Sequence, residues 1–211
     1  MLKERSAERI GRLCGHLGLA ALVLALSWGG TRTAEAATYT FVKDYTSVRF
    51  SWSNLGLSRQ SARVMGITGT VDFDPTAPNA SRVDVLMQAS SLWTGVPAFD
   101  ELLKSIEYFD AQRHPTIRFR STGARQLSDR TGELTGELTV MGITKPVTLN
   151  VVWNFSGEHP LATVNPNYKD VFVSGFSATG VLRRSDWGLT RAVPLVSDEI
   201  ELTIETELLR R

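Results

Sequence analysis

The sequence of 211 residues predicts an all-β fold. Apolar and polar residues alternate over many short segments, turn-forming residues separate these segments, and only one stretch has the spacing of a helix. Strict alternation is typical of antiparallel strands with one buried face and one wet face. Many such strands joined by short turns form either a sandwich or a barrel.

The expected strands share a period of two, with an apolar residue at every second position. In chain order they are residues 48–53, 67–73, 83–89, 117–120, 134–140, 147–153, 173–183 and 199–208. Gly175 and Gly180 lie inside the seventh of them, and glycine weakens a strand unless a bend, a bulge or a close approach requires it. This strand is therefore expected to curve, as barrel strands do.

A short helix is expected over residues 97–112. The apolar residues of this segment recur at helical spacing, at Phe99, Leu102, Leu103, Ile106 and Phe109. Pro97 precedes the segment, and His114-Pro115 ends it because proline cannot continue a helix. The apolar face of the helix needs a partner, and the mouth or end of a barrel is a natural place for it.

Residues 1–36 have the three regions of an export signal. Basic residues precede an apolar core of about 12 residues, and Ala34-Glu35-Ala36 matches a signal-peptidase site. A membrane span needs roughly 20 apolar residues, so a cleaved signal is expected rather than an uncleaved anchor. Cleavage before Ala37 would leave residues 37–211 as one domain with a substantial core.

The mature chain would be nearly neutral and free of cysteine. Loss of residues 1–36 removes five basic and three acidic residues, which leaves 18 basic and 19 acidic ones. This balance argues against a nucleic-acid partner, which usually requires a basic face. The only cysteine, Cys14, lies within the signal, so neither a disulfide nor thiol chemistry is expected in the mature protein.

The mature sequence offers few groups for catalysis or metal binding. Its two histidines, His114 and His159, each precede a proline, and no cluster of His, Cys, Asp or Glu has the spacing of a metal site. It contains no nucleophile elbow and no phosphate-binding glycine loop, and no cofactor is expected. Arg183, Arg184 and Asp186 could either hold a charged ligand head or form structural ion pairs at a strand end.

Large apolar side chains could point into one interior. Alternation alone fits a solid core and a hollow one equally well, because both bury every second residue. A barrel of about eight strands has room for one small ligand. Met and aromatic side chains on such a lining would suit a flexible hydrocarbon.

Several motifs occur in a fixed order between Tyr39 and Leu208. They are Gly69-Thr70-Val71-Asp72-Phe73-Asp74-Pro75, Asp100-Glu101-Leu102-Leu103-Lys104-Ser105, His114-Pro115-Thr116-Ile117-Arg118-Phe119, Gly136-Glu137-Leu138-Thr139-Val140-Met141-Gly142-Ile143-Thr144-Lys145-Pro146-Val147 and Arg184-Ser185-Asp186-Trp187-Gly188. The ordered set resembles the YceI-like family, periplasmic lipocalin-like proteins that bind polyisoprenoids. Trp93 and Trp187 depart from the family pattern, and a bulky ring at either place is expected to shorten the pocket.

The resemblance implies an extended antiparallel, lipocalin-like barrel of about eight strands around an apolar pocket. It implies a polyisoprenoid or a similar long-chain amphiphile, such as a quinone, as ligand, and it implies no catalytic residue. A periplasmic location and a homodimer are also expected, together with transient membrane contact for a protein that carries or stores a lipid.

Ten side chains are expected to form the apolar lining around the lipid tail. They are Phe50, Trp52, Phe73, Met87, Phe109, Phe119, Leu138, Val140, Phe176 and Trp187. Arg183 and Asp186 are expected either to hold the head group or to act as a structural latch. Two other classes stay open: an enzyme acting on such a lipid, with His114 or Asp100 as acid–base group, and a stress-related scaffold protein without a transport role.

Overall fold

The computed structural model describes residues 36–210. The expected signal peptide, residues 1–36, lies outside the described residues except for Ala36, so its cleavage stays a prediction. No helix within residues 36–210 combines the length and the apolar character that crossing a membrane requires.

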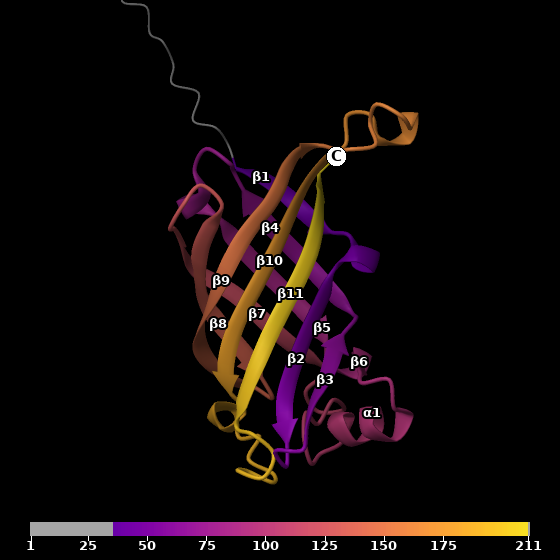
Figure 1. The fold of residues 1–211 in the computed structure, drawn as a ribbon, viewed down its shortest axis with the longest axis vertical. Helices are drawn as coiled ribbons and strands as arrows, with labels where there is room; N and C mark the ends of the chain where they lie inside the picture. The colour runs from indigo at the N-terminus through magenta and orange to yellow at the C-terminus, as the bar shows by residue number, and fades with distance from the viewer. Residues whose placement is uncertain (1–35, 211) are drawn as a thin grey trace, which may run out of the picture. The chain divides into compact units, whose positions relative to one another are not determined.

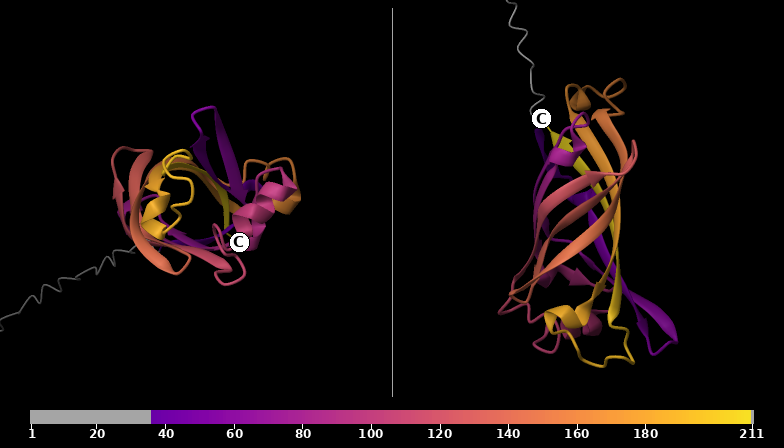
Figure 2. Two further views of the ribbon diagram at one scale, coloured as in Figure 1. Left: turned by 90° about the horizontal axis from the view of Figure 1, so that it is seen from below. Right: turned by 90° about the vertical axis from the view of Figure 1, so that its left-hand side faces the viewer.

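Eight antiparallel strands form a closed ring, which confirms the predicted all-β barrel (Figure 1 and Figure 2). In ring order they are β1 (Ala37–Phe41), β4 (Ile67–Phe73), β5 (Arg82–Gln88), β7 (Thr116–Gln126), β8 (Thr131–Val140), β9 (Ile143–Glu158), β10 (Phe172–Arg183) and β11 (Glu199–Arg210). Pairing of Thr40 with Leu209 and of Phe41 with Leu208 joins β1 to β11 and closes the ring. The alternation within each strand turns one apolar face toward the interior of this ring.

Three further strands branch from the ring. β2 (Ser47–Asn54) pairs with β11 beyond the end of β1, β3 (Ser58–Val64) pairs with β2, and β6 (Leu92–Trp93) pairs with β3. The barrel wall therefore forks at β11, which has β1 as its neighbour at one end and β2 at the other. β3 was not among the expected strands, because its first four residues are all polar and its alternation is confined to the end.

The helix α1 (Pro97–Lys104) packs against the branch and lies beside one end of the ring (Figure 2). Its Leu103 is buried against Trp52 of β2 and Ala62 of β3. The helix ends at Lys104 rather than at residue 112, because Ser105 takes an extended conformation and its hydroxyl donates to the Leu102 carbonyl at 2.7 Å. The expected helix is thus present but shorter than its apolar spacing predicts.

Five short 3-10 helices connect strands within the described residues. They are Lys43–Tyr45, Pro78–Ala80, Ala89–Ser91, Pro166–Tyr168 and Arg184–Trp187. The pairing of β10 with β9 shifts register between Gly175 and Phe176, which places an irregularity where curvature was expected. At Gly180 a Cβ atom would lie 2.8 Å from Cδ2 of Leu149 and 3.3 Å from the Thr148 carbonyl oxygen, so a larger residue would require the Leu149 side chain to shift.

Candidate functional site

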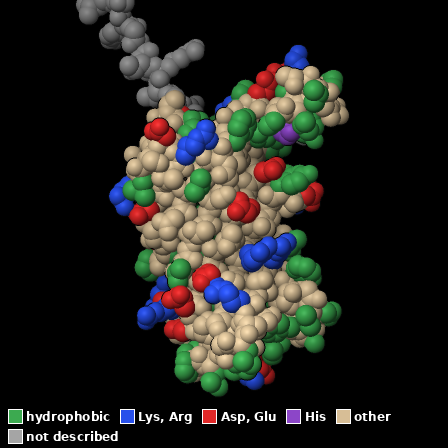
Figure 3. Space-filling view, in the orientation of Figure 1, with side chains coloured by type: hydrophobic (Ala, Val, Ile, Leu, Met, Phe, Trp, Pro, Cys, Tyr) green, Lys and Arg blue, Asp and Glu red, His purple; other side chains and the backbone are tan. Residues whose placement is uncertain are grey.

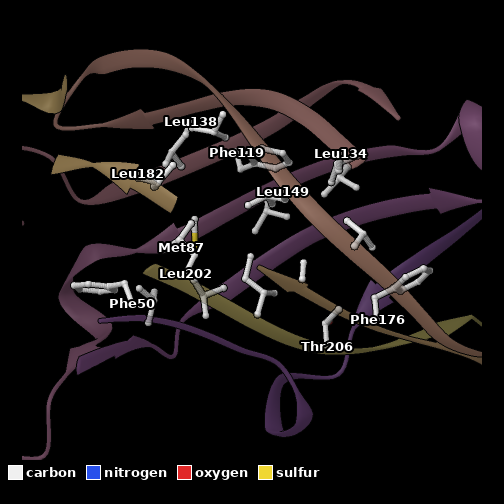
Figure 4. A pocket seen from close by; sticks show the side chains of 18 of the residues that line it. Phe50, Met87, Phe119, Leu134, Leu138, Leu149, Phe176, Leu182, Leu202 and Thr206 are labelled. Atoms are coloured by element: carbon white, nitrogen blue, oxygen red, sulfur yellow. The ribbon is translucent and has the colours of Figure 1, made fainter. Parts of the chain in front are cut away.

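The ring encloses a cavity of about 520 Å³. Protein interiors normally contain few voids larger than a water molecule, so a space of this size is not a packing defect. Its volume falls within the roughly 300–1,000 Å³ of small-molecule pockets. Figure 4 shows side chains from several strands pointing into this space, with Phe50 and Phe176 far apart along it. The choice between a solid and a hollow interior, which alternation left open, is therefore decided in favour of a hollow one.

All ten side chains expected in the apolar lining face this cavity. They are Phe50, Trp52, Phe73, Met87, Phe109, Phe119, Leu138, Val140, Phe176 and Trp187. Their contact with a ligand stays a prediction, but the barrel does bring them together. Further apolar lining comes from residues that the analysis of the sequence did not single out, such as Leu149, Ala178 and Leu202.

Aromatic side chains cross the cavity near the β7–β8 hairpin. The ring of Phe73 on β4 meets the rings of Trp153 on β9 and Phe176 on β10 edge-on, with centroids 5.3 and 5.0 Å away. β4 lies across the barrel from these two strands. The three rings therefore narrow the cavity at this level, and such contacts contribute about 0.5–1.5 kcal/mol per pair beyond area burial.

Beyond these rings the lining becomes polar at the β7–β8 hairpin. The backbone pairing between β5 and β7 ends at Asp84 and Arg120. Closer to the hairpin, the backbone amide of Gln126 on β7 donates instead to the side-chain Oδ1 of Asn79 at 2.6 Å. Exposed residues of the hairpin, among them Asp129 and Arg130, line the cavity here, so the cavity meets solvent at this end. We call this polar border, residues 125–133, the hairpin rim.

The hairpin rim carries two basic and two acidic residues, so its formal charges balance. Arg125 pairs with Glu133 at 2.6 Å. The Arg130 guanidinium donates to the Asn154 carbonyl at 2.7 Å and lies 5.9 Å from the centre of the Trp153 ring, over its face. An exposed ion pair contributes about 0–1 kcal/mol, so the rim is a polar entrance rather than a strongly charged one.

The opposite end of the cavity is bordered by residues of α1 and by the connection between β10 and β11 (Figure 2). Phe50 stacks on Trp52 at 5.8 Å and contacts Phe109 at 5.9 Å. Trp187 is 3% exposed, and its Nε1 donates to the Leu138 carbonyl at 3.1 Å, which fixes the indole across the cavity. The expectation that Trp187 limits the pocket thus agrees with its position.

A buried arginine, Arg184, also lines the cavity at this end. It is 7% exposed, and its guanidinium donates to the carbonyl oxygens of Leu189, Val196 and Ser197. Burial lowers the pKa of Arg184 from its ordinary value, and the nearby Tyr108 and Asp198 oppose this only in part. The guanidinium holds the connection between β10 and β11 in place by binding three of its carbonyls.

Arg183 and Asp186, proposed from the sequence for the head group or for a latch, are exposed and do not line the cavity. Arg184 takes the inward position instead. The alternation of β10 already contained this signal, because Ala178 and Leu182 face inward and two further positions lead to Arg184. Trp93 is 50% exposed and outside the lining, so the expectation that it shortens the pocket is wrong.

The two candidate acid–base groups of a lipid-modifying enzyme lie outside the cavity lining. Oδ1 of Asp100 accepts hydrogen bonds from the backbone and hydroxyl of Thr94, both at 2.6 Å, and these bonds lower the pKa of Asp100. His114 donates its backbone N–H to the Asp110 carbonyl at 2.8 Å. The other histidine within residues 36–210, His159, stacks on Tyr168 at 3.9 Å in the β9–β10 loop.

Comparison with known proteins places the chain among bacterial relatives of the same size. A "UPF0312 protein" of Pseudomonas savastanoi pv. phaseolicola is 30% identical over 90% of this chain and 95% of its own length. The crystal structure of BcnA from Burkholderia cenocepacia has a TM-score of 0.68 and 17% identity, and covers 81% of this chain and 99% of that one.

A polyisoprenoid-binding domain from Saccharophagus degradans, implicated in plant cell wall breakdown, has the same fold, with a TM-score of 0.56 and 10% identity over 83% of this chain and 99% of that one. The YceI protein of Campylobacter jejuni has a TM-score of 0.65 and 25% identity over 74% of this chain and 87% of that one. Residues 39–208 match the YceI-like domain. The chain therefore belongs to the YceI-like family.

Proposed function

We propose that this protein binds a polyisoprenoid or a similar long-chain amphiphile, including an isoprenoid quinone, inside the barrel. The observation that carries the proposal is the cavity of about 520 Å³ with its apolar lining. Burial of hydrocarbon in such a space gains about 0.8 kcal/mol per methylene group. Membership of the YceI-like family and the fold shared with a polyisoprenoid-binding domain support the same ligand class.

An adaptable side chain in the lining supports a flexible chain rather than a rigid ligand. Met87 on β5 points into the cavity (Figure 4), and methionine adapts its shape to irregular apolar partners. Asp100 and His114 lie outside the lining, so the proposal is binding rather than conversion of the lipid.

Native mass spectrometry of protein purified from its own cell envelope tests this proposal. The expected spectrum shows a long-chain species that leaves the protein under collisional activation. Organic extraction followed by mass analysis then identifies its chain and head. A consistently ligand-free mass, together with failure of isoprenoid alcohols to bind the purified protein, would contradict the proposal.

The role that we propose for the bound lipid is carriage or storage in the periplasm. The export signal that the sequence of residues 1–36 predicts supports this location. The prediction is recovery of the mature protein, beginning at Ala37, in the periplasmic fraction. Recovery of the full-length chain in membranes or in the cytoplasm would contradict it. We also propose a homodimer, which light scattering on purified protein would detect as twice the monomer mass.

Transient contact with a membrane is part of the same proposal. Exposed apolar side chains gather near α1 at the end of the barrel opposite the hairpin rim, where Figure 3 shows hydrophobic atoms at the surface. Leu57, Leu195 and Ile106 are 83%, 67% and 67% exposed. They come from the β2–β3 turn, the β10–β11 connection and the segment after α1. Leu55 donates its amide to the Leu195 carbonyl at 2.8 Å, so two of these segments adjoin.

The rate of lipid transfer from vesicles to the protein tests membrane contact separately from the affinity of the cavity for the lipid. In a Leu57→Glu, Ile106→Glu variant the transfer rate is expected to fall, while affinity for lipid dissolved in detergent stays the same. Val164→Glu is the matched control, because Val164 is 75% exposed but belongs to the β9–β10 loop. Equal transfer rates for both variants and the wild type would refute contact through this surface.

A further inference from the structure

A cation lies against the apolar cavity without a carboxylate partner. Among residues 36–210 no Asp or Glu oxygen forms a salt bridge with Arg184, although the protein forms such pairs elsewhere, as between Arg125 and Glu133. A buried charge is normally paired with an opposite charge, because desolvation of an isolated ion is costly. Arg184 therefore differs from the other arginines that line the cavity, Arg125 and Arg130, which are exposed.

The hydrogen bonds of Arg184 leave part of its donor capacity free. A guanidinium carries five N–H groups. Nε donates to Ser197, and each terminal nitrogen donates once, to Leu189 and to Val196. One N–H on each terminal nitrogen thus has no acceptor among these contacts. A guanidinium can donate such N–H groups to the oxygens of an acidic head, and charge-assisted bonds of this kind are the strong ones.

The nearest acid in this connection does not complete the site. Asp198 accepts from the amide of Ser185 at 2.9 Å and from its hydroxyl at 2.7 Å, and these bonds are the main reason why the pKa of Asp198 is lowered. Its carboxylate thus stabilises the 3-10 turn and acts on Arg184 only at longer range. Tyr108 also lines the cavity and packs against the core cluster that contains Trp187, so its hydroxyl belongs to the same lining.

We propose that the cavity takes an amphiphile with an acidic head, a carboxylate or a phosphate monoester, seated beside Arg184 and Tyr108 with its tail running toward Phe73, Trp153 and Phe176. This inference rests on the proposed lipid-binding function and specifies its ligand class and orientation. A negative head would complete the charge of Arg184, whereas a neutral head would leave it uncompensated. The hairpin rim offers no comparable site for an acid, because its arginines, Arg125 and Arg130, are exposed and keep their contact with solvent.

Displacement of the neutral fluorophore N-phenyl-1-naphthylamine at neutral pH tests the inference with matched pairs of ligands. Palmitate is compared with hexadecanol, and farnesyl monophosphate with farnesol, so that the two sources of an acidic head are measured separately. In each pair that binds, the acid is expected to bind at least about tenfold more tightly than the alcohol, because a hydrogen bond to a charged group is worth that difference in Kd. Equal binding of acid and alcohol in both pairs would overturn the inference.

Two variants test whether Arg184 causes the preference for the acid over the alcohol. Arg184→Gln is expected to lose the preference for the acid while it retains the affinity for the alcohol. Arg183→Gln, a neighbour outside the lining, is the control and is expected to behave as the wild type. An unchanged preference in Arg184→Gln would refute the role of this side chain. If no ligand of either pair displaces the fluorophore, the proposed function itself fails, which is a different outcome.

Arg184 also holds three backbone carbonyls, so a second measurement uses the wild-type protein alone. The carboxyl carbon of ¹³C-labelled palmitate is titrated by NMR in the complex. A carboxylate beside a guanidinium has a lowered pKa, whereas a carboxyl buried without a cation has a raised one. The inference expects a lowered pKa, and a raised or ordinary value would overturn it.

Discussion

Filling the cavity from its wall should weaken ligand binding without weakening the fold. Ala178 lies on β10, faces the cavity and is 9% exposed. Ala178→Phe would place a ring in space that the ligand-free protein leaves open. Thr179 is the next residue on the same strand, but it is exposed and outside the lining, so Thr179→Phe is a matched control.

The expected magnitude follows from the number of ligand atoms displaced. Phenylalanine adds about six heavy atoms to alanine and excludes a similar number of ligand atoms, each contributing ~0.3 kcal/mol in a ligand of this size. The loss is about 1.8 kcal/mol, or about twentyfold in Kd. Burial of a Phe side chain favours folding by about 1.5–3 kcal/mol, so the Tm of the ligand-free variant should not fall.

Two measurements together check this reasoning. Kd is measured by displacement of a neutral fluorophore with an isoprenoid alcohol, and Tm is measured by circular dichroism without ligand. The expected result is weaker binding with an equal or higher Tm for Ala178→Phe, and no change in Kd for Thr179→Phe. Wild-type affinity in Ala178→Phe would refute a ligand position inside the barrel, and a drop in Tm would refute the open space at this site.

Three further predictions concern folding, pH and export. Gly136→Val should lower the free energy of unfolding by about 1–3 kcal/mol in denaturant titrations, because a Cβ would lie 2.5 Å from the ring of Phe119; an unchanged midpoint would contradict the close approach. Asp84→Asn should cost less than about 1 kcal/mol at neutral pH. The Arg118 hydrogen bonds lower the pKa of Asp84. The contribution of Asp84 to the free energy of unfolding is therefore present above its unfolded-state pKa and is lost as pH falls through its folded-state pKa. A difference in the free energy of unfolding between Asp84→Asn and the wild type that persists in strong acid would contradict this. Intact-mass analysis should find Ala37 as the first residue, and Ala34→Arg, Ala36→Arg should leave the signal attached.

The period of two predicted seven of the eight ring strands, because each of them has one dry face and one wet face. β1 (Ala37–Phe41) was not among the expected strands, and the strand expected at residues 48–53 is β2, which branches from the ring. β3 escaped the same pattern, since it lies outside the closed ring and buries only Ala62 and Val64. The helix was predicted too long, because apolar residues at helical spacing continue past Lys104 while the Ser105 hydroxyl ends the hydrogen-bond ladder there. Apolar spacing predicts which residues are buried. It predicts where a helix ends only if the sequence also contains a recognisable capping residue.

The cavity itself could not be predicted from alternation, because a solid core and a hollow one require the same inward residues. The volume depends on how far Phe73 and Phe119 reach across the ring, which is set by strand tilt and register rather than by residue type. Arg184 was one of three residues considered for a charged ligand head, and continuing the alternation of β10 through Leu182 would have singled it out as the inward one. The nearby charged residues Arg183 and Asp186 were assigned to the head group or to a latch, because both are polar and belong to the same motif.

The ring has one short seam. β1 and β11 share two residue pairs, whereas β10 and β11 share twelve along their full length. Backbone amides exchange with solvent most readily where few hydrogen bonds must open together. The β1–β11 pairing is therefore expected to open more readily than the β10–β11 pairing. Separation of β1 from β11 would open the barrel wall while the other ladders of the ring stay intact.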